Sequence, residues 1–490
     1  MTTRREHDLL GDRDVPAEAY YGVHTLRAVE NFPISGTPIS IYPDLIAALA
    51  SIKLAAAKSN RELGLLDGKL ADVIVAASEE VRAGALHEQF VVDVIQGGAG
   101  TSTNMNANEV IANRALELMG ADKGAYTTLH PIEDVNASQS TNDVYPTAVR
   151  IALWLGIERL LASMAFLRAG FEAKAEEFKD ILKIGRTQLQ DAVPMTLGQE
   201  FLTYAIMIGE DEARMREARA LIQEINLGAT AIGTGINAPG GYSDRACQLL
   251  AEISGVPVEK ASNLIEATQD TGAFVQLSGV LKRVACKLSK ICNDLRLLSS
   301  GPQAGFGDIR LPARQAGSSI MPGKVNPVIP EVMNQVAFEV IGNDMTVTMA
   351  SEAGQLQLNA FEPVIAHSLL QSLSWMTNAC RTLRVNCIDG ITANTARLTQ
   401  QVETSVGVVT ALTPYIGYAA SAALAHTALT TNSSIADLVV AAGLMSADEV
   451  ARVLSPERLS GVAPITGVIV LPPVTVPDDI AKAQAESDES

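Results

Sequence analysis

The chain has 490 residues and a formal net charge of −18, and 47% of its residues are hydrophobic but only 4% aromatic. A length beyond the ~250–300 residues of one large core predicts two or three domains, and few aromatics favour packed helices over a β-sandwich. The acidic charge argues against nucleic acid or an anionic membrane as a partner.

Residues 1–140 form the first predicted zone, which mixes short helical patterns with loops. The chain opens without the apolar core of a signal peptide, and no apolar run approaches the ~20 residues of a membrane span. Five scattered cysteines without CxxC spacing are typical of reduced thiols in a cytosolic protein. We therefore expect a cytoplasmic location.

Long helical patterns dominate the second zone, residues 141–395. Apolar residues recur at helical spacing over 154–182, and over 274–298 their steps alternate three and four, as in a coiled-coil seam. Residues 330–386 carry few helix breakers and predict one or two further helices. Helices this long must lie nearly parallel or antiparallel to share a core, which predicts a bundle. Apolar residues on several sides of 336–341 predict that bundles of several subunits pack together.

The helical patterns become shorter after residue 395. Residues 396–465 therefore predict a small C-terminal helical domain. Residues 466–490 are rich in acidic, small and polar side chains, which predicts a flexible acidic tail.

Four polar segments interrupt the apolar patterns, and each joins hydroxyl and amide side chains to glycines or to a helix start. They are residues 97–104 (GGAGTSTN), 138–143 (SQSTND), 185–190 (GRTQLQ) and 317–326 (GSSIMPGKVN). Hydroxyls, amides and helix N-termini all favour a bound carboxylate, and Lys324 would supply a formal positive charge. One such segment alone is usually only a helix cap or a turn. Four in one chain indicate a site for a carboxylate.

The sequence indicates neither a metal site nor a nucleotide site. The six histidines are far apart and form no HxxxH or HExxH pattern. The glycines of residues 97–100 lack the strand, spacing and downstream acid of a dinucleotide-binding fingerprint. Val325 stands where a phosphate-binding loop requires Ser or Thr after its lysine.

The segment GSSIMPGKVNP, residues 317–327, resembles the signature loop of the aspartase/fumarase superfamily, and the other three segments resemble its remaining active-site regions. The resemblance extends from about residue 6 to about residue 464. DLLGDRDVPAEAYYGVHTLRAVENF, QGGAGTS and VNPVIPEV are more similar to aspartases than to class II fumarases. The resemblance implies an all-α, three-domain subunit with a central five-helix bundle. It also implies a homotetramer with a twenty-helix core, in which each active site takes segments from three subunits.

The resemblance further implies reversible deamination of L-aspartate to fumarate and ammonia, by Cβ proton abstraction through an aci-carboxylate intermediate. Ser318 would be the general base. The residues implied to bind substrate are Thr101, Ser140, Thr141 and Ser319 at the β-carboxylate, Lys324 and Asn326 at the α-carboxylate, and Asn142, Thr187 and Gln188 at the amino group. No cofactor is required, although the resemblance allows activation by a divalent cation such as Mg²⁺.

Three alternatives stay open at this point. A fumarase would hydrate fumarate with the same four segments, but Gln188 stands where many relatives, fumarases especially, carry His, which disfavours His-assisted water chemistry. Superfamily members that act on argininosuccinate or adenylosuccinate take larger substrates and match these segments less well. A structural or storage protein built from the same bundle would bind no dicarboxylate, so a thermal-shift measurement with fumarate or succinate separates it from an enzyme.

Overall fold

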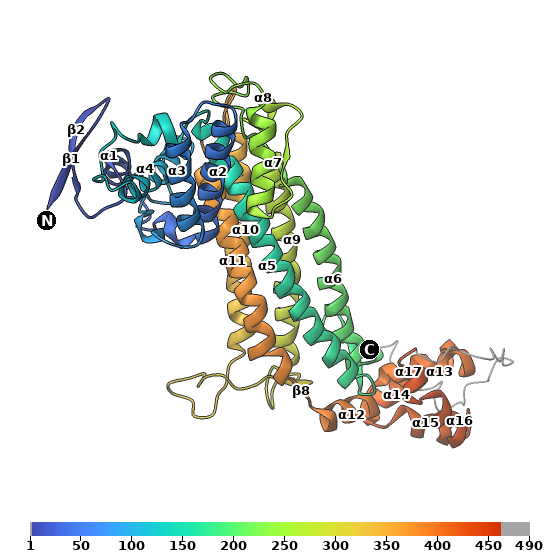
Figure 1. Ribbon diagram of the computed structural model, residues 1–490. Helices are drawn as coiled ribbons and strands as arrows, with labels where there is room; N and C mark the ends of the chain where they lie inside the picture. Colours follow the sequence, from blue (N-terminus) through green and yellow to red (C-terminus); the bar gives the residue numbers. More distant parts are fainter. Residues whose placement is uncertain (1, 462–490) are drawn as a thin grey trace. The chain divides into compact units, whose positions relative to one another are not determined.

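The computed structural model describes residues 2–461 and is mostly helical (Figure 1). The predicted all-α class is confirmed, with four small two-stranded sheets in addition among the described residues. Contacts between residues divide the chain into two compact units. Of the described residues, unit 1 contains 2–164, 210–288 and 335–379, and unit 2 contains 165–209, 289–334 and 380–461. The domain boundaries expected from the sequence stay predictions, and the expected tail, 466–490, lies outside the described residues.

The five longest helices among residues 2–461 each contribute residues to both units. They are α5 (Thr141–Glu177), α6 (Leu197–Leu221), α9 (Gly272–Leu298), α10 (Val328–Glu352) and α11 (Glu362–Asn386). The apolar seam predicted for α9 is buried, since Leu277, Leu281 and Ile291 are each at most 1% exposed. Burial of one such side chain contributes about 1.5–3 kcal/mol. The seam therefore explains why this helix is held along its whole length.

One of these helices ends earlier than the sequence pattern predicts, and the stretch predicted as one or two helices forms two. The helical pattern over 154–182 is too long, because α5 ends at Glu177 and Leu182 begins strand β3 (Leu182–Thr187). Burial on one face of a strand continues the apolar spacing, so periodicity alone does not mark this end. Residues 330–386 form two helices, and Pro363 lies in the first turn of α11, where its missing N–H costs no helical hydrogen bond.

Four helices of unit 1 lie beside one another, with α2 in contact with the other three (Figure 1). They are α2 (Pro43–Glu62), α3 (Gly68–Arg82), α4 (Thr101–Leu118) and α7 (Tyr242–Ser254). Small side chains allow the close packing of these four helices: Ala55 and Ala56 of α2 are fully buried.

The shorter elements of unit 1 are β1 (Thr3–Asp8), β2 (Gly11–Pro16), α1 (Val23–Asn31), 3-10 helices at Ile39–Ile41 and His87–Gln89, a π-helix at Pro131–Val135, β5 (Glu224–Ile225), β6 (Glu259–Lys260) and α8 (Leu264–Ala267).

Unit 2 contains two antiparallel pairs of strands and a group of short helices. Strand β3 pairs with β4 (Gln190–Thr196), and β7 (Ile309–Arg310) pairs with β8 (Thr392–Ala393). The short helices are α12 (Thr395–Thr404), α13 (Val409–Ile416), α14 (Tyr418–Thr431), α15 (Ile435–Ala441), α16 (Ala447–Val453) and α17 (Pro456–Leu459), with 3-10 turns at Ile388–Gly390 and Val406–Val408. Leu412, Leu424 and Val439 are at the centre of an apolar core that α13–α16 share.

Helix α10 leaves large apolar side chains in solvent. Phe338, Met345 and Met349 are 62%, 62% and 65% exposed, and their spacing of seven and four places them on one face of the helix. Exposed apolar patches of this kind are typical of contact surfaces between proteins. No helix among residues 2–461 combines the length and the apolar character needed to cross a membrane.

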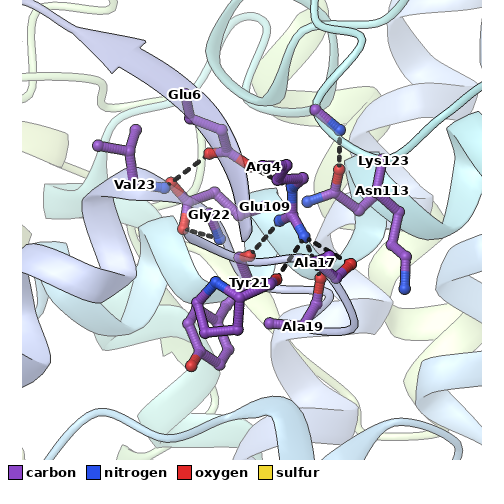
Figure 2. Close-up of polar contacts among 12 residues, drawn as sticks. Arg4, Glu6, Ala17, Ala19, Tyr21, Gly22, Val23, Glu109, Asn113 and Lys123 are labelled. Carbon is purple, nitrogen blue, oxygen red and sulfur yellow. Dashed lines mark hydrogen bonds and ion pairs between the residues drawn. The ribbon is translucent and has the colours of Figure 1, made fainter. Parts of the chain in front are cut away.

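Two buried carboxylates hold the start of α1 (Figure 2). Glu109 of α4 accepts the N–H of Gly22 at 2.8 Å and two further N–H groups in the first turn of α1, at 2.8 and 3.1 Å. Glu6 accepts the N–H of Val23 at 2.8 Å. These bonds satisfy N–H groups that have no acceptor within the helix. A Cβ at position 22 would lie 2.6 Å from the Glu6 carboxylate, so a larger residue there would displace that carboxylate.

Replacing Glu109 with Gln is expected to lower the free energy of unfolding by about 1–3 kcal/mol, because the amide leaves part of this buried N–H cluster without an acceptor. Burial raises the pKa of Glu109 from 4.5 to about 7, so the native state binds its proton more tightly than the unfolded chain does. The Glu109 contribution to stability therefore decreases as the pH rises from 4.5 to about 7. Urea titrations of the wild type and of Glu109→Gln across that pH range measure this contribution. Glu79→Gln is the control variant, because Glu79 is exposed. Equal stability of the two variants at every pH would contradict this role.

Candidate active site

Three of the predicted site residues lie together at the start of α5. Ser140 directly precedes the helix, and Thr141 and Asn142 begin it, at the end where the helix dipole favours an anion. A cavity of about 350 Å³ opens here, within unit 1. Its lining residues are Asn136, Ser138, Gln139, Ser140, Thr141, Thr230, Ala231, Ile236 and Asn237.

A buried carboxylate fixes one wall of this cavity. Asp143, fully buried, accepts the N–H groups of Ser140 at 3.0 Å, Gly228 at 3.1 Å and Thr230 at 2.9 Å. Burial raises the pKa of Asp143 to about 6, against the lowering effect of these bonds. The bonds from Gly228 and Thr230 join the start of α5 to residues 226–241, which carry the opposite wall.

Hydrogen bonds also set which atoms of Thr141 and Asn142 are available to a ligand. The side-chain N–H of Asn104 donates to the Thr141 hydroxyl oxygen at 3.1 Å, which leaves the hydroxyl hydrogen of Thr141 to donate. The amide N–H of Asn142 donates to the carbonyl of Ala231 at 2.7 Å, which leaves its oxygen to accept. A hydroxyl donor suits a carboxylate, and an amide acceptor suits an ammonium group.

The glycine-rich segment before α4 makes a tight turn against α5. Gly98 and Gly100 have φ angles of +90° and +89°, and a Cβ on Gly100 would lie 2.3 Å from the Tyr145 ring. Thr101 begins α4, and its hydroxyl donates to the carbonyl of Gly98 at 2.8 Å. Thr101 does not line the cavity itself. Asn104, one turn later on the same helix, is the residue that contacts Thr141.

Thr187 and Gln188 lie at the exposed turn between β3 and β4, in unit 2. Gln188 and Leu189 form a two-residue turn with φ angles of +52° and +63°. Residues other than glycine adopt this conformation at a cost of about 1–3 kcal/mol each, and such strain is concentrated at functional sites. The strained backbone of this turn therefore supports Gln188 as a candidate functional residue.

Arg186 and Lys183 anchor the hairpin that carries this turn. Arg186 donates to the fully buried Asp308 at 2.6 Å, and the Lys183 ammonium lies 2.6 Å from Glu200 and 3.4 Å from Asp308. Asp308 belongs to the segment that leads into the signature loop. The two predicted regions of unit 2 are thus connected through one buried ion cluster.

The signature loop, residues 317–326, is closed at its base. The N–H of Gly317 donates to the carbonyl of Lys324, and the Asn326 side chain donates to the carbonyl of Gly317, both at 2.8 Å. The Ser318 hydroxyl oxygen accepts two backbone N–H groups, from Ile320 at 3.2 Å and from Met321 at 2.9 Å.

The predicted loop residues differ in exposure. Ser319 and Lys324 are exposed, whereas Ser318 and Asn326 are partly covered. Among residues 2–461 the Lys324 ammonium has no ion-pair or hydrogen-bond partner, so its charge is available to an anion. The predicted site residues thus form two groups, one in each unit.

Comparisons with known proteins decide the family. A lyase family model matches residues 11–342, and a model of the fumarase C C-terminus matches residues 408–461. The chain belongs to the aspartase/fumarase superfamily of lyases. It is 59% identical to the aspartate ammonia-lyase of Pseudomonas aeruginosa over 94% of this chain and 97% of that protein. It is 54% identical to the aspartate ammonia-lyase of Escherichia coli, over 93% of this chain and 96% of that one.

Solved structures of superfamily members are also similar. A fumarate lyase:delta crystallin from Brucella melitensis, bound to cobalt, has a TM-score of 0.91 and 55% identity over 94% of this chain and 99% of that one. The class II fumarase of Schistosoma mansoni has a TM-score of 0.89 and 34% identity over 94% of this chain and 99% of that one. The chain is therefore an enzyme of the lyase class with the mostly helical, three-domain lyase fold.

Three parts of this candidate site could not be recognised from the sequence. Thr230, Ala231, Ile236 and Asn237 line the cavity, although the only signal of their segment, 226–241, is a high glycine content. Asn104 was seen only as part of a polar segment, and Lys53, which contacts Asn104, was concealed in an apolar helical pattern. No three His, Cys, Asp or Glu side chains among residues 2–461 gather closely enough to hold a metal ion.

Proposed function

We propose that the protein is an aspartate ammonia-lyase that converts L-aspartate reversibly into fumarate and ammonia. The observation that carries the proposal is the Ser318 hydroxyl oxygen, which accepts two backbone N–H groups. A serine is a weak base until its oxyanion is stabilised, and two fixed N–H donors supply that stabilisation. The names of the relatives, at up to 59% identity, support aspartate as the substrate.

The reaction breaks a C–H bond and then a C–N bond. The Ser318 alkoxide takes the Cβ proton, and the electron pair of that bond moves into the β-carboxylate, which becomes an aci-carboxylate dianion. That pair then forms the Cα–Cβ double bond while the C–N pair departs with ammonia. The proton held by Ser318 passes to solvent and resets the base.

Hydroxyl donors that bind the dianion more strongly than the ground-state carboxylate lower the barrier. The proposal assigns this role to Ser140 and Thr141 at the start of α5, together with Thr101 and Ser319. The free hydroxyl hydrogen of Thr141 supports it. The same distinction between donor and acceptor supports Asn142 at the ammonium group, where its amide oxygen accepts.

Lys324 and Asn326 are proposed to bind the α-carboxylate, and Thr187 and Gln188 to face the amino group. Gln188 cannot relay a proton as an imidazole does. This supports loss of ammonia over addition of water, which is the fumarase alternative. The strained turn keeps the Gln188 side chain exposed for this contact.

The active enzyme is proposed to be a cytoplasmic homotetramer whose sites take segments from three subunits. The exposed apolar face of α10, with Phe338, Met345 and Met349, supports burial against other copies of the chain. Mg²⁺ is proposed as an activator at most, and no step depends on it. Equal rates with Mg²⁺ and with a chelator would remove even that role.

The test of the activity is a product balance. Purified full-length protein given L-aspartate should form fumarate and ammonia in equal amounts, and fumarate with ammonium should regenerate L-aspartate. If neither product forms at every substrate concentration tested, the proposal is wrong. If, in addition, neither fumarate nor succinate gives a thermal shift, a structural protein built from the same bundle is favoured.

A further inference from the structure

Lys53 of α2 is a fully buried cation without a direct carboxylate partner among residues 2–461. Its ammonium donates to three side-chain amide oxygens: Asn104 at 2.7 Å, Asn136 at 2.9 Å and Gln139 at 2.9 Å. An ammonium has three hydrogens and no acceptor, so every hydrogen has a partner here. Burial lowers the pKa of Lys53 to about 7, and the negative charge of Asp143 opposes this lowering. The three amide oxygens accept from the charged form.

This arrangement fixes the direction of the surrounding hydrogen bonds. Because the Asn104 oxygen faces Lys53, its amide nitrogen donates to the Thr141 hydroxyl oxygen and to the Asn136 amide oxygen, both at 3.1 Å. The Gln139 amide is oriented in the same way, with its N–H group donating to the carbonyl of Val135 at 3.1 Å. Lys53 accepts no hydrogen bond in its charged form, so neither amide group can flip without placing its N–H groups against the ammonium.

We propose that Lys53 is a positioning residue that keeps Thr141 a hydrogen-bond donor to the carboxylate of the substrate. It acts through Asn104 and does not touch the substrate. The inference rests on the proposed function, since it assigns Thr141 to the carboxylate that becomes a dianion. Without Lys53, the Asn104 amide can turn its oxygen to Thr141 and accept the hydroxyl hydrogen that the substrate needs.

Asn104→Asp tests this orientation with little change in volume. The carboxylate pairs with Lys53, so the fold is retained, but it has no hydrogen to donate and must accept from Thr141. We expect kcat for L-aspartate to fall about 10²-fold, as when one donor to a developing oxyanion is lost. Asn113→Asp is the matched control, because Asn113 lies on the same helix and contacts Tyr20, Gly124 and Tyr126 instead. Its kcat should remain near that of the wild type.

Lys53→Met and Thr141→Val form a second test, as single variants and combined. If Lys53 acts through Thr141, the double variant loses no more kcat than Thr141→Val alone. Multiplied losses would mean an independent effect of Lys53 and would overturn the inference, as would wild-type kcat in Asn104→Asp. If Lys53→Met fails to fold, the comparison of kcat between Asn104→Asp and Asn113→Asp tests the inference alone.

Succinate binding separates this inference from the proposed function, because succinate is a dicarboxylate that does not react. Weaker succinate binding in Asn104→Asp than in Asn113→Asp, by calorimetry, supports the positioning role even if the wild type does not turn over aspartate. If the wild type turns over aspartate but Asn104→Asp has unchanged kcat and unchanged succinate binding, the proposed role of Lys53 is wrong. The proposed activity is then unaffected.

Discussion

Replacing Ser318 with Ala is expected to lower kcat for L-aspartate by about 10²–10⁴-fold, the usual contribution of a positioned general base. The methyl group removes both the base and the acceptor of the two N–H groups from Ile320 and Met321. The free energy of unfolding should change little, because the loop is exposed. Stopped assays for fumarate and calorimetry with succinate measure the two effects separately.

Ser318→Asn separates loss of the base from loss of the turn. An Asn side-chain oxygen can accept N–H groups two and three residues later, as the serine does, but it is not a base. Inactivity of both variants with retained succinate binding therefore supports proton abstraction by Ser318. Near-normal kcat in either variant would remove Ser318 from this role.

Lys324→Gln is expected to raise KM for L-aspartate roughly 10–100-fold, because a charge-assisted hydrogen bond to the α-carboxylate is replaced by a neutral one. Lys324→Arg should also impair the enzyme, since a planar fork does not substitute for a compact ammonium. Initial rates over a range of aspartate concentrations, at low and high salt, give KM and its ionic-strength dependence.

Lys179→Gln is the control for nonspecific charge effects, because Lys179 is an exposed lysine of the same unit that pairs with the neighbouring Glu176. Its KM should match that of the wild type. If Lys324→Gln and Lys179→Gln behave alike, the α-carboxylate is bound elsewhere and the assignment of Lys324 is wrong.

The long helices could be predicted because their signal repeats. The seam of α9 places an apolar residue at every third or fourth position, and the structure buries it. The end of α5 could not be predicted, because Leu182 continues the apolar spacing after the chain has changed from helix to strand. Spacing reports which residues face a core, and it does not report which backbone conformation brings them there.

The candidate site could be predicted only where its residues are unusual in their local context. Ser318 and Lys324 lie in a polar, glycine-rich loop that no helix pattern explains. Lys53 lies among buried alanines and leucines, and its importance appears only when folding brings Asn104 and Gln139 to its ammonium. The direction of a hydrogen bond depends on every partner at once, so one sequence segment cannot show it.

The most direct test of the account is the appearance of fumarate by its ultraviolet absorbance, with L-aspartate in one cuvette and L-malate in another. The account predicts rapid signal from aspartate and none from malate, since Gln188 offers no imidazole for water chemistry. Signal from malate alone would identify a fumarase and contradict the proposed substrate.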